Sequence, residues 1–298
     1  MPFFYALFPG VATPLFRKVS NIYSYFERMQ HRPVVLITGA SSGIGKSTAH
    51  YLADRGYRVY GTTRKSPNNT GGEAVTLLQL DVRDEDSVRS AVRELLGLEG
   101  RIDILINNAG VGITGPLEET PHQACLDALE TNFHGPLRVI RHVLPVMRQQ
   151  QSGFIVNITS IAGFMGLPYR GIYSAGKSAL GIATEAYRME VRGFGIKMCT
   201  LAPGDYATNI ASGRFHSPLL EDSPYRQSYG NSLKLMDDHV DAGNDPEEVG
   251  RKVYRILQKK HPRVHYTVGS PMQRLSLTLK RMLPDKIFER LLLKHYKL

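Results

Sequence analysis

The chain has 298 residues, a length that suits one large α/β domain with extensions or at most two small domains. With 42 % hydrophobic and 21 % charged residues, it is not a wholly disordered chain. Its net charge of +10 suits nucleic acid, anionic membrane or phosphate-bearing ligands without choosing among them. Cys125 and Cys199, the two cysteines, lie in apolar stretches and favour a reduced intracellular protein over a disulfide framework, while no apolar run reaches the roughly 18 residues of an ordinary membrane-spanning helix.

Residues 1–31 differ in composition from the rest of the chain. They are rich in aromatic residues and are interrupted by prolines and a glycine. A signal peptide has a basic segment before its apolar run, whereas here Arg17 and Lys18 follow it. We interpret the segment as a poorly ordered leader, or as translation upstream of a start at Met29, in preference to a membrane-touching arm.

From residue 32 to residue 270, apolar β-rich runs alternate with segments of helical periodicity. The predicted strands are 34–38, 58–62, 76–82, 102–107, 154–159, 197–201 and 264–268. The predicted helices lie near 44–55, 84–96, 121–130, 132–150, 174–193 and 246–260. This alternation predicts an α/β fold with a doubly wound, seven-stranded parallel sheet, helices on both faces, and ligands at the carboxyl ends of the strands.

A glycine-rich turn, Thr38 to Gly45, joins the first predicted strand to the first helix. Glycines there allow an unusual backbone and a close approach of a phosphate to the N–H groups of the helix N-terminus. The sequence Gly45-Lys46-Ser47 resembles the end of a nucleoside-triphosphatase phosphate loop, but that motif needs glycine where Ala40 stands. The spacing also departs from the dinucleotide pattern GxGxxG, with three residues between Gly39 and Gly43, so the turn by itself predicts only a site for a phosphate-bearing ligand.

Further motifs follow this turn in a fixed order. They are Asn107-Asn108-Ala109-Gly110, Asn132, Ser160, Tyr173-x-x-x-Lys177, Pro203-Gly204 and Thr208. Together they resemble the short-chain dehydrogenase/reductase family over about residues 33–270. The resemblance implies a Rossmann-type catalytic domain with Asn132, Ser160, Tyr173 and Lys177 as its catalytic residues. It also implies that Asn132 anchors a water that passes protons to Lys177.

The spacing of Tyr173 and Lys177 has a chemical explanation that does not depend on the resemblance. Residues four apart share one face of a helix. An ordinary tyrosine loses its proton only near pH 10. An ammonium about 4 Å away stabilises the phenolate by roughly 4 kcal/mol at an effective dielectric near 20. The pair therefore predicts an acid/base for alcohol oxidation or ketone reduction, with Ser160 holding the substrate oxygen.

The second predicted strand indicates the cofactor. It runs into Thr63, Arg64 and Lys65, where an NAD site usually has an acidic residue for the ribose hydroxyls. Because a guanidinium suits a 2′-phosphate, this sequence favours NADP(H) over NAD(H). The alternative is that Arg64 and Lys65 are solvated loop residues that contact no cofactor. With the resemblance, the predicted cofactor-binding residues are Gly39, Ser41, Ser42, Gly43, Ile44, Gly45, Arg64, Asp81, Val82, Asn108, Ala109, Gly110, Tyr173, Lys177, Pro203, Gly204 and Thr208.

Residues 205–244 break the alternation and are predicted to form a loop-rich lid over the substrate. Apolar residues of the lid, such as Tyr229 and Met236, and of the segment 164–168 either line a lipophilic cavity or only pack the lid. The basic segment 271–298 is predicted to form two short helices divided by Pro284. This tail either packs on the domain, which we prefer, covers the substrate cleft, or rests on an anionic membrane.

The predicted function is NADPH-dependent reduction of a lipophilic ketone, such as a long-chain keto-lipid like 3-ketosphinganine, a steroid or a retinoid. This rests on similarity to retinol, hydroxysteroid and long-chain ketone enzymes. The alternatives are a catalytically silent NADP(H)-sensing protein and a nucleic-acid-binding protein, for which no motif is present. The histidines show no metal-ligand spacing, so no metal is predicted. The resemblance suggests a homodimer or homotetramer, and we expect a cytoplasmic protein, either free or peripheral to a membrane.

Overall fold

The computed structural model describes residues 32–67, 74–206, 213–241 and 244–298. The compact unit considered below extends from Val34 to Leu298. The predicted leader, residues 1–31, and the predicted cofactor-binding residue Thr208 lie outside the described residues.

A seven-stranded parallel sheet forms the centre of the unit, which confirms the predicted fold class. Its spatial order is β3-β2-β1-β4-β6-β7-β9. Since the chain winds outward from β1 in both directions, the strand order reverses beside β1, and a crevice opens there at the carboxyl ends of the strands. The bounds are β1 Val34–Ile37, β2 Arg58–Thr63, β3 Val75–Gln79, β4 Ile104–Asn107, β6 Gly153–Ile158, β7 Ile196–Pro203 and β9 His265–Val268.

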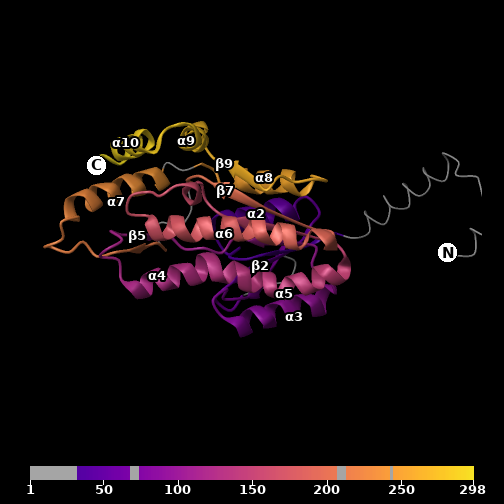
Figure 1. Cartoon of the computed structure of the whole chain (residues 1–298). Helices are drawn as coiled ribbons and strands as arrows, with labels where there is room; N and C mark the ends of the chain where they lie inside the picture. Colours follow the sequence, from indigo (N-terminus) through magenta and orange to yellow (C-terminus); the bar gives the residue numbers. More distant parts are fainter. Residues whose placement is uncertain (1–31, 68–73, 207–212, 242–243) are drawn as a thin grey trace, which may run out of the picture. The chain divides into compact units, whose positions relative to one another are not determined.

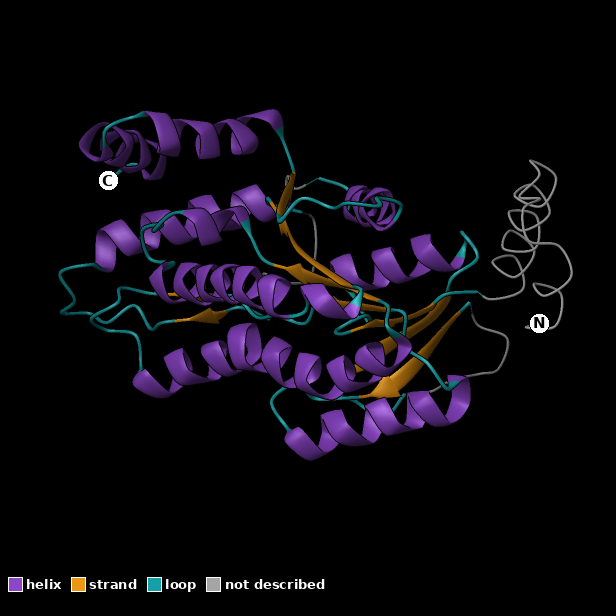
Figure 2. Ribbon diagram, turned by 45° about the vertical axis from the view of Figure 1, so that its right-hand side comes forward, coloured by secondary structure: helices purple, strands orange, loops and turns teal. Residues whose placement is uncertain are grey.

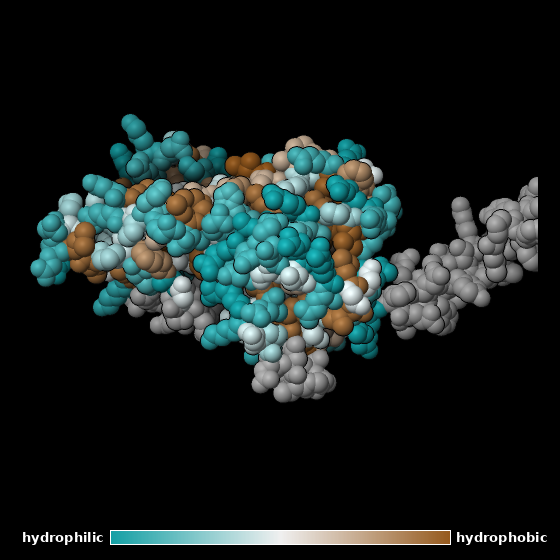
Figure 3. Space-filling view, turned by 90° about the horizontal axis from the view of Figure 1, so that it is seen from below, coloured by the Kyte–Doolittle hydropathy of each residue, from teal (hydrophilic) through white to brown (hydrophobic). Residues whose placement is uncertain are grey.

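Helices cover both faces of this sheet (Figures 1 and 2). One face packs against α2 (Gly43–Ala53) and α8 (Glu247–Leu257). The other packs against α3 (Glu85–Glu99), α5 (Gly135–Gln150) and α6 (Gly171–Glu190). Seen from the side of α3 and α5, the surface is mostly hydrophilic (Figure 3), so these helices place their apolar residues toward the sheet.

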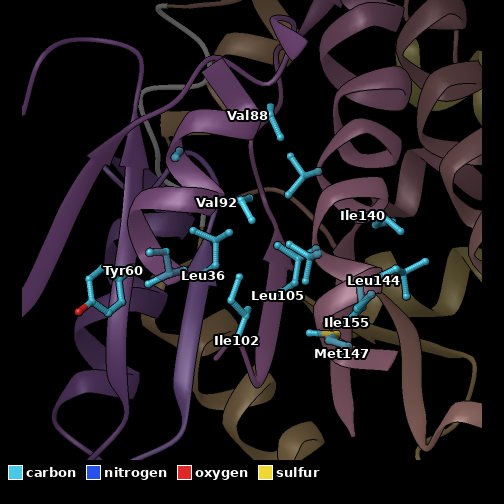
Figure 4. Close-up of a cluster of buried hydrophobic side chains, with 14 of the residues drawn as sticks. Leu36, Tyr60, Val88, Val92, Ile102, Leu105, Ile140, Leu144, Met147 and Ile155 are labelled. Carbon is cyan, nitrogen blue, oxygen red and sulfur yellow. The ribbon is translucent and has the colours of Figure 1, made fainter. Parts of the chain in front are cut away.

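Alternation along each strand divides the core into two layers. Leu36 of β1 lies opposite Tyr60 of β2 and Leu105 of β4 in register. These three side chains point toward α3 and α5, where they pack with Val88, Val92, Ile140, Leu144 and Met147 (Figure 4). Burying one such leucine contributes about 2 kcal/mol. The sheet is thereby held rigid beneath the loops at its carboxyl edge.

The lid prediction is wrong in part, because residues 205–244 are not uniformly loop. They contain β8 (Phe215–His216), which pairs with β5 (Ile113–Thr114), and the helix α7 (Arg226–Asp241). Tyr229 is buried, donates to the Thr114 carbonyl oxygen at 3.0 Å, and packs against Tyr169. The helix was not predicted, although Tyr229, Leu233 and Met236 have helical spacing. Polar residues and a glycine in the same segment weaken this pattern.

The tail forms two helices, α9 (Pro271–Met282) and α10 (Asp285–Tyr296), separated at Pro284 as expected. Phe288 is buried against Ile161 and Met165, and leucines of both helices complete this cluster. One side of the tail therefore packs on the domain, which is the alternative that we preferred from the sequence. Across the part of the chain that is described, no helix combines the length and apolarity needed to cross a membrane.

Candidate active site

The glycine-rich turn is tied to the end of β4 by hydrogen bonds. The Thr38 hydroxyl oxygen accepts from the backbone N–H groups of Asn108 and Ala109, both at 3.0 Å. The Asn108 amide in turn donates to the carbonyl oxygens of Thr38 and Gly39. These bonds fix two neighbouring loops at the crevice where the sheet reverses its strand order.

The glycines of this turn meet a steric requirement. Gly39 has a φ of +67°, in the left-handed region that side chains resist. A Cβ at Gly45 would lie 2.3 Å from the Gly39 carbonyl oxygen and 2.4 Å from the Asn108 side-chain nitrogen. The turn can therefore close only with glycine at these positions. The N-terminus of α2 is left open to an anion such as a cofactor phosphate.

A cleft with a cavity volume of about 340 Å³ lies over this turn. Most residues predicted to form the site line it. Asn132 lies behind its wall, and Thr208 is not among the described residues. The predicted residues that line the cleft are Gly39, Ser41, Ser42, Gly43, Ile44, Gly45, Arg64, Asp81, Val82, Asn108, Ala109, Gly110, Ser160, Tyr173, Lys177, Pro203 and Gly204.

One end of the cleft is cationic. Arg64 is exposed there beside the half-buried Thr63, and Arg83 lies nearby. Arg83 forms a bidentate contact with Asp81, with a shortest distance of 2.9 Å, and its guanidinium lowers the pKa of that carboxyl. Asp81 is thus already paired with Arg83. Arg64, whose charge also lowers the pKa of Asp81, lines the cleft and forms no ion pair with a carboxylate of the described residues.

The helix α6 carries Tyr173 and Lys177 into the opposite part of the cleft. Tyr173 is buried, and its hydroxyl bonds to no group of the described protein, so it is available to a ligand. Lys177 donates from Nζ to the carbonyl oxygen of Ile158 at 3.0 Å. Burial lowers the pKa of Lys177 to about 8, so its charge changes within the range where enzymes work.

Ser160 follows β6 and caps the short helix η2 (Ile161–Phe164). Its Oγ accepts from the backbone N–H of Ala162 at 3.1 Å. Because that bond uses a lone pair, the hydroxyl proton remains free to donate to an oxygen in the cleft. A capping role and a substrate-binding role are therefore compatible in this residue.

Asn132 lies in η1 (Glu130–His134), a π-helical turn between α4 (His122–Leu129) and α5. Its side chain exchanges two hydrogen bonds with the Val111 backbone, at 2.8 and 3.0 Å. A Cβ at Gly110 would lie 3.0 Å from the Asn132 oxygen and 3.2 Å from Lys177 Nζ. Both side chains thus adjoin Gly110. The apolar pattern predicted the flanking helices but not the π-turn, because one inserted residue shifts the pattern in the same way as a break between two helices.

Several lining residues were not expected from the sequence. The Arg170 guanidinium lies 5.3 Å from the centroid of the Tyr173 ring, and Asp205 and Arg214 also line the cleft. Single charges in loops carry no periodic signal that would have singled them out. By contrast, Met165 and Tyr229, two of the candidates for apolar lining of the cleft, pack in the protein interior. The packing alternative holds for these two residues.

Comparison with known proteins identifies relatives along most of the chain. A family model described as short chain dehydrogenase matches residues 33–218. A 3-ketodihydrosphingosine reductase from Bacteroides thetaiotaomicron is 41% identical over 257 residues, covering 86% of this chain and 95% of that protein. Retinol dehydrogenase 8 from Bos taurus is 31% identical over 252 residues, covering 76% and 78%. A solved short-chain dehydrogenase from Streptomyces avermitilis matches with a TM-score of 0.75 and 29% identity, covering 90% and 96%.

Proposed function

Because this chain belongs to the short-chain dehydrogenase/reductase family of oxidoreductases, we propose that it reduces a lipophilic ketone with NADPH and that Tyr173 is the proton donor. One observation carries the proposal: a single cleft is lined by the glycine-rich turn, Ser160, Tyr173 and Lys177. A nucleotide site and an acid/base site in one cavity are what hydride transfer to a carbonyl requires.

In the proposed reaction the Ser160 hydroxyl and the Tyr173 hydroxyl both donate to the ketone oxygen. The nicotinamide, when bound, supplies the hydride. As negative charge develops on the oxygen, Ser160 stabilises it and Tyr173 transfers its proton. The Lys177 ammonium then offsets the charge left on the tyrosine, and Asn132 holds the Val111 backbone beside this ammonium. The chain thus positions the carbonyl group and transfers the proton to its oxygen.

The preference for NADPH rests on the cationic end of the cleft. Arg64 faces the cleft, whereas the carboxylate of Asp81 is occupied by Arg83. Thr63 stands where an acidic residue would accept from the ribose hydroxyls of NADH. We therefore assign Arg64 to the 2′-phosphate of NADPH.

Replacing Arg64 with alanine is expected to raise the Kd for NADPH about ten- to a hundredfold, the loss expected for one charge-assisted contact. The Kd for NADH should change little, because NADH has no 2′-phosphate. Calorimetric titration of both cofactors measures these effects without turnover. Lys65→Ala is the matched control, since Lys65 is also exposed but does not line the cleft. An equal loss for both cofactors, or the same loss in the control, would contradict the assignment.

For the substrate we propose a long-chain keto-lipid of the 3-ketodihydrosphingosine type. The relative with that activity in its name aligns along nearly its whole length. Consumption of NADPH with this ketone, compared with a ketone of the same head but a chain of about four carbons, tests the proposal. A strong preference for the long chain supports a lipid substrate, whereas equal turnover of both would contradict it.

A keto-lipid resides in membranes, and we propose that the outward side of the tail rests on an anionic membrane surface. Met272, Leu275 and Met282 are exposed on one side of α9, at 74%, 47% and 75%. Residues 273–298 hold seven Lys or Arg against two acids, a net of 7 − 2 = +5. Apolar residues beside cations are typical of helices that lie in the membrane interface.

Co-sedimentation with vesicles tests this surface. Binding is expected to vesicles that contain phosphatidylserine, with little binding to phosphatidylcholine alone, because each cation near an anionic surface contributes about 1 kcal/mol. The double variant Met272→Ser/Met282→Ser should bind severalfold less. Met189→Ser is the control, because Met189 is 72% exposed but belongs to α6. Equal losses in both variants, or equal binding to both lipids, would overturn the proposal.

A further inference from the structure

The cleft contains a carboxylate that has no cationic partner among the described residues. Among the described lining residues, the carboxylates are Asp81, which pairs with Arg83, and Asp205. Asp205 follows Pro203-Gly204 at the end of β7 and is half-buried. Among the described residues, Asp205 forms no ion pair with a Lys, Arg or His, and its side-chain partner is the neutral amide of Gln273. A partly desolvated carboxylate in this situation favours a cationic ligand.

The carboxylate of Asp205 is held in a fixed orientation by the tail. Gln273 belongs to the capping box of α9, in which its Oε1 accepts from the Ser270 N–H at 3.2 Å. The amide nitrogen of Gln273 must then face outward, and it donates to Asp205 Oδ2 at 2.8 Å. The other oxygen, Oδ1, has no partner within the described residues and is left for a ligand.

Gly204 makes this arrangement possible. A Cβ at Gly204 would lie 2.1 Å from Gln273 Oε1, so any side chain at position 204 would expel the amide. The backbone oxygen of Asp205 is also held, since it accepts from the N–H of Asn244 at 3.3 Å. Contacts from two distant segments therefore converge on one acidic residue in the cleft.

Arg170, the cation that lies over the ring of the acid/base residue, is engaged elsewhere. Arg170 lies over the Tyr173 ring and interacts with Tyr296, a buried residue of α10. Burial raises the pKa of Tyr296. The charge of Asp205 also raises this pKa, whereas the charge of Arg170 lowers it. Tyr296 is thus close to both charges, and Arg170 forms no ion pair with Asp205. The Asp205 carboxylate stays available in the same cavity as Tyr173.

We propose that Asp205 binds the protonated amine of an α-amino ketone, while Ser160 and Tyr173 bind its carbonyl oxygen. This inference rests on the proposed function and deepens it. 3-Ketodihydrosphingosine carries its amine on the carbon next to the ketone, so one cavity of about 340 Å³ would hold both groups. The ion pair would fix which face of the carbonyl is presented, and it would discriminate against ketones that lack the amine.

The test compares the free amine 3-ketodihydrosphingosine with its N-acetyl derivative, which has the same ketone and chain but no charge. In the wild-type protein with NADPH, kcat/KM should favour the free amine about ten- to a hundredfold, the effect of a charge-assisted contact. Asp205→Asn keeps the shape and should lose most of that factor, chiefly through KM, while turnover of the N-acetyl ketone is retained. Asp222→Asn, an exposed aspartate outside the cleft, is the control and should behave as wild type.

Binding gives a readout that does not depend on turnover. The Kd of the saturated 2-amino-1,3-diol product should rise about tenfold or more in Asp205→Asn, whereas the Kd of NADPH should not change. If Asp205→Asn loses the same factor with both ketones, or if the wild type does not distinguish them, the amine site is overturned and the proposed function stands. If the wild type reduces neither ketone although it binds NADPH, the proposed substrate fails and the amine site fails with it.

Discussion

Replacing Tyr173 with phenylalanine is expected to lower kcat for ketone reduction about a thousandfold, within the range that a positioned general acid contributes. The variant loses one hydroxyl, which forms no hydrogen bond to the described protein and lines the cleft. The fold and the Kd for NADPH should therefore be unchanged. Steady-state kinetics with NADPH in excess, together with cofactor titration, measure the two effects separately.

Tyr187→Phe is the matched control for this variant. Tyr187 lies on the same helix, α6, but packs against the hydrophobic core away from the cleft. The same chemical change there should leave kcat within about twofold, since no reacting group is removed. If Tyr173→Phe kept more than a tenth of the wild-type kcat, the proton would have to come from another group, and the assignment of Tyr173 would fail.

The rate of ketone reduction should fall as the pH rises above about 8. Lys177 has a folded-state pKa of about 8 because it is buried, so the ammonium that offsets charge on Tyr173 is lost above that value. We expect kcat/KM to be flat below this pH and to fall about tenfold per unit above it, as for loss of one essential proton. Lys177→Arg keeps the charge and should move the fall to higher pH. Lys177→Met should lower the rate about a hundredfold or more at neutral pH.

The same lysine gives the stability of the protein a defined pH dependence. Its pKa is lower in the folded protein than the value of 10.5 for an exposed lysine, so between pH 8 and 10.5 the unfolded chain binds the extra proton. The free energy of unfolding should therefore rise with pH across this window, by about 1.4 kcal/mol per unit from this group. Urea unfolding at several pH values measures the slope. Lys177→Met should remove this contribution, and an unchanged slope in that variant would contradict it.

The sequence predicted the sheet well because its signal is local. Apolar strands such as β1 and β6 are buried on both faces and appear as continuous β-rich runs, and the helices between them have clear amphipathic periodicity. The helix α7 was missed because its apolar residues are few and its neighbours are polar. The π-turn at Asn132 was missed because the shift that it causes in the apolar pattern is the same as that of a break between two helices.

The site also contains features that the sequence predicted and one that it did not. The turn from Thr38 to Gly45 and the pair Tyr173 and Lys177 are contiguous patterns with a physical reason for their spacing, so their common cleft could be predicted. The contact of Asp205 with Gln273 joins residues 68 positions apart. It depends on the capping box of α9 and on the space left by Gly204. No pattern in the sequence indicates such a contact, because it exists only once the tail has packed on the domain.

The most direct test of the central claim is the oxidation of NADPH by the wild-type protein in the presence of 3-ketodihydrosphingosine, followed by absorbance with the product identified by mass spectrometry. We predict one alcohol formed for each NADPH consumed, much slower consumption with NADH, and loss of the reaction in Tyr173→Phe. Binding of NADPH without turnover of this ketone or of other lipophilic ketones would contradict the account, and it would indicate that the chain binds the nucleotide without reducing a lipid.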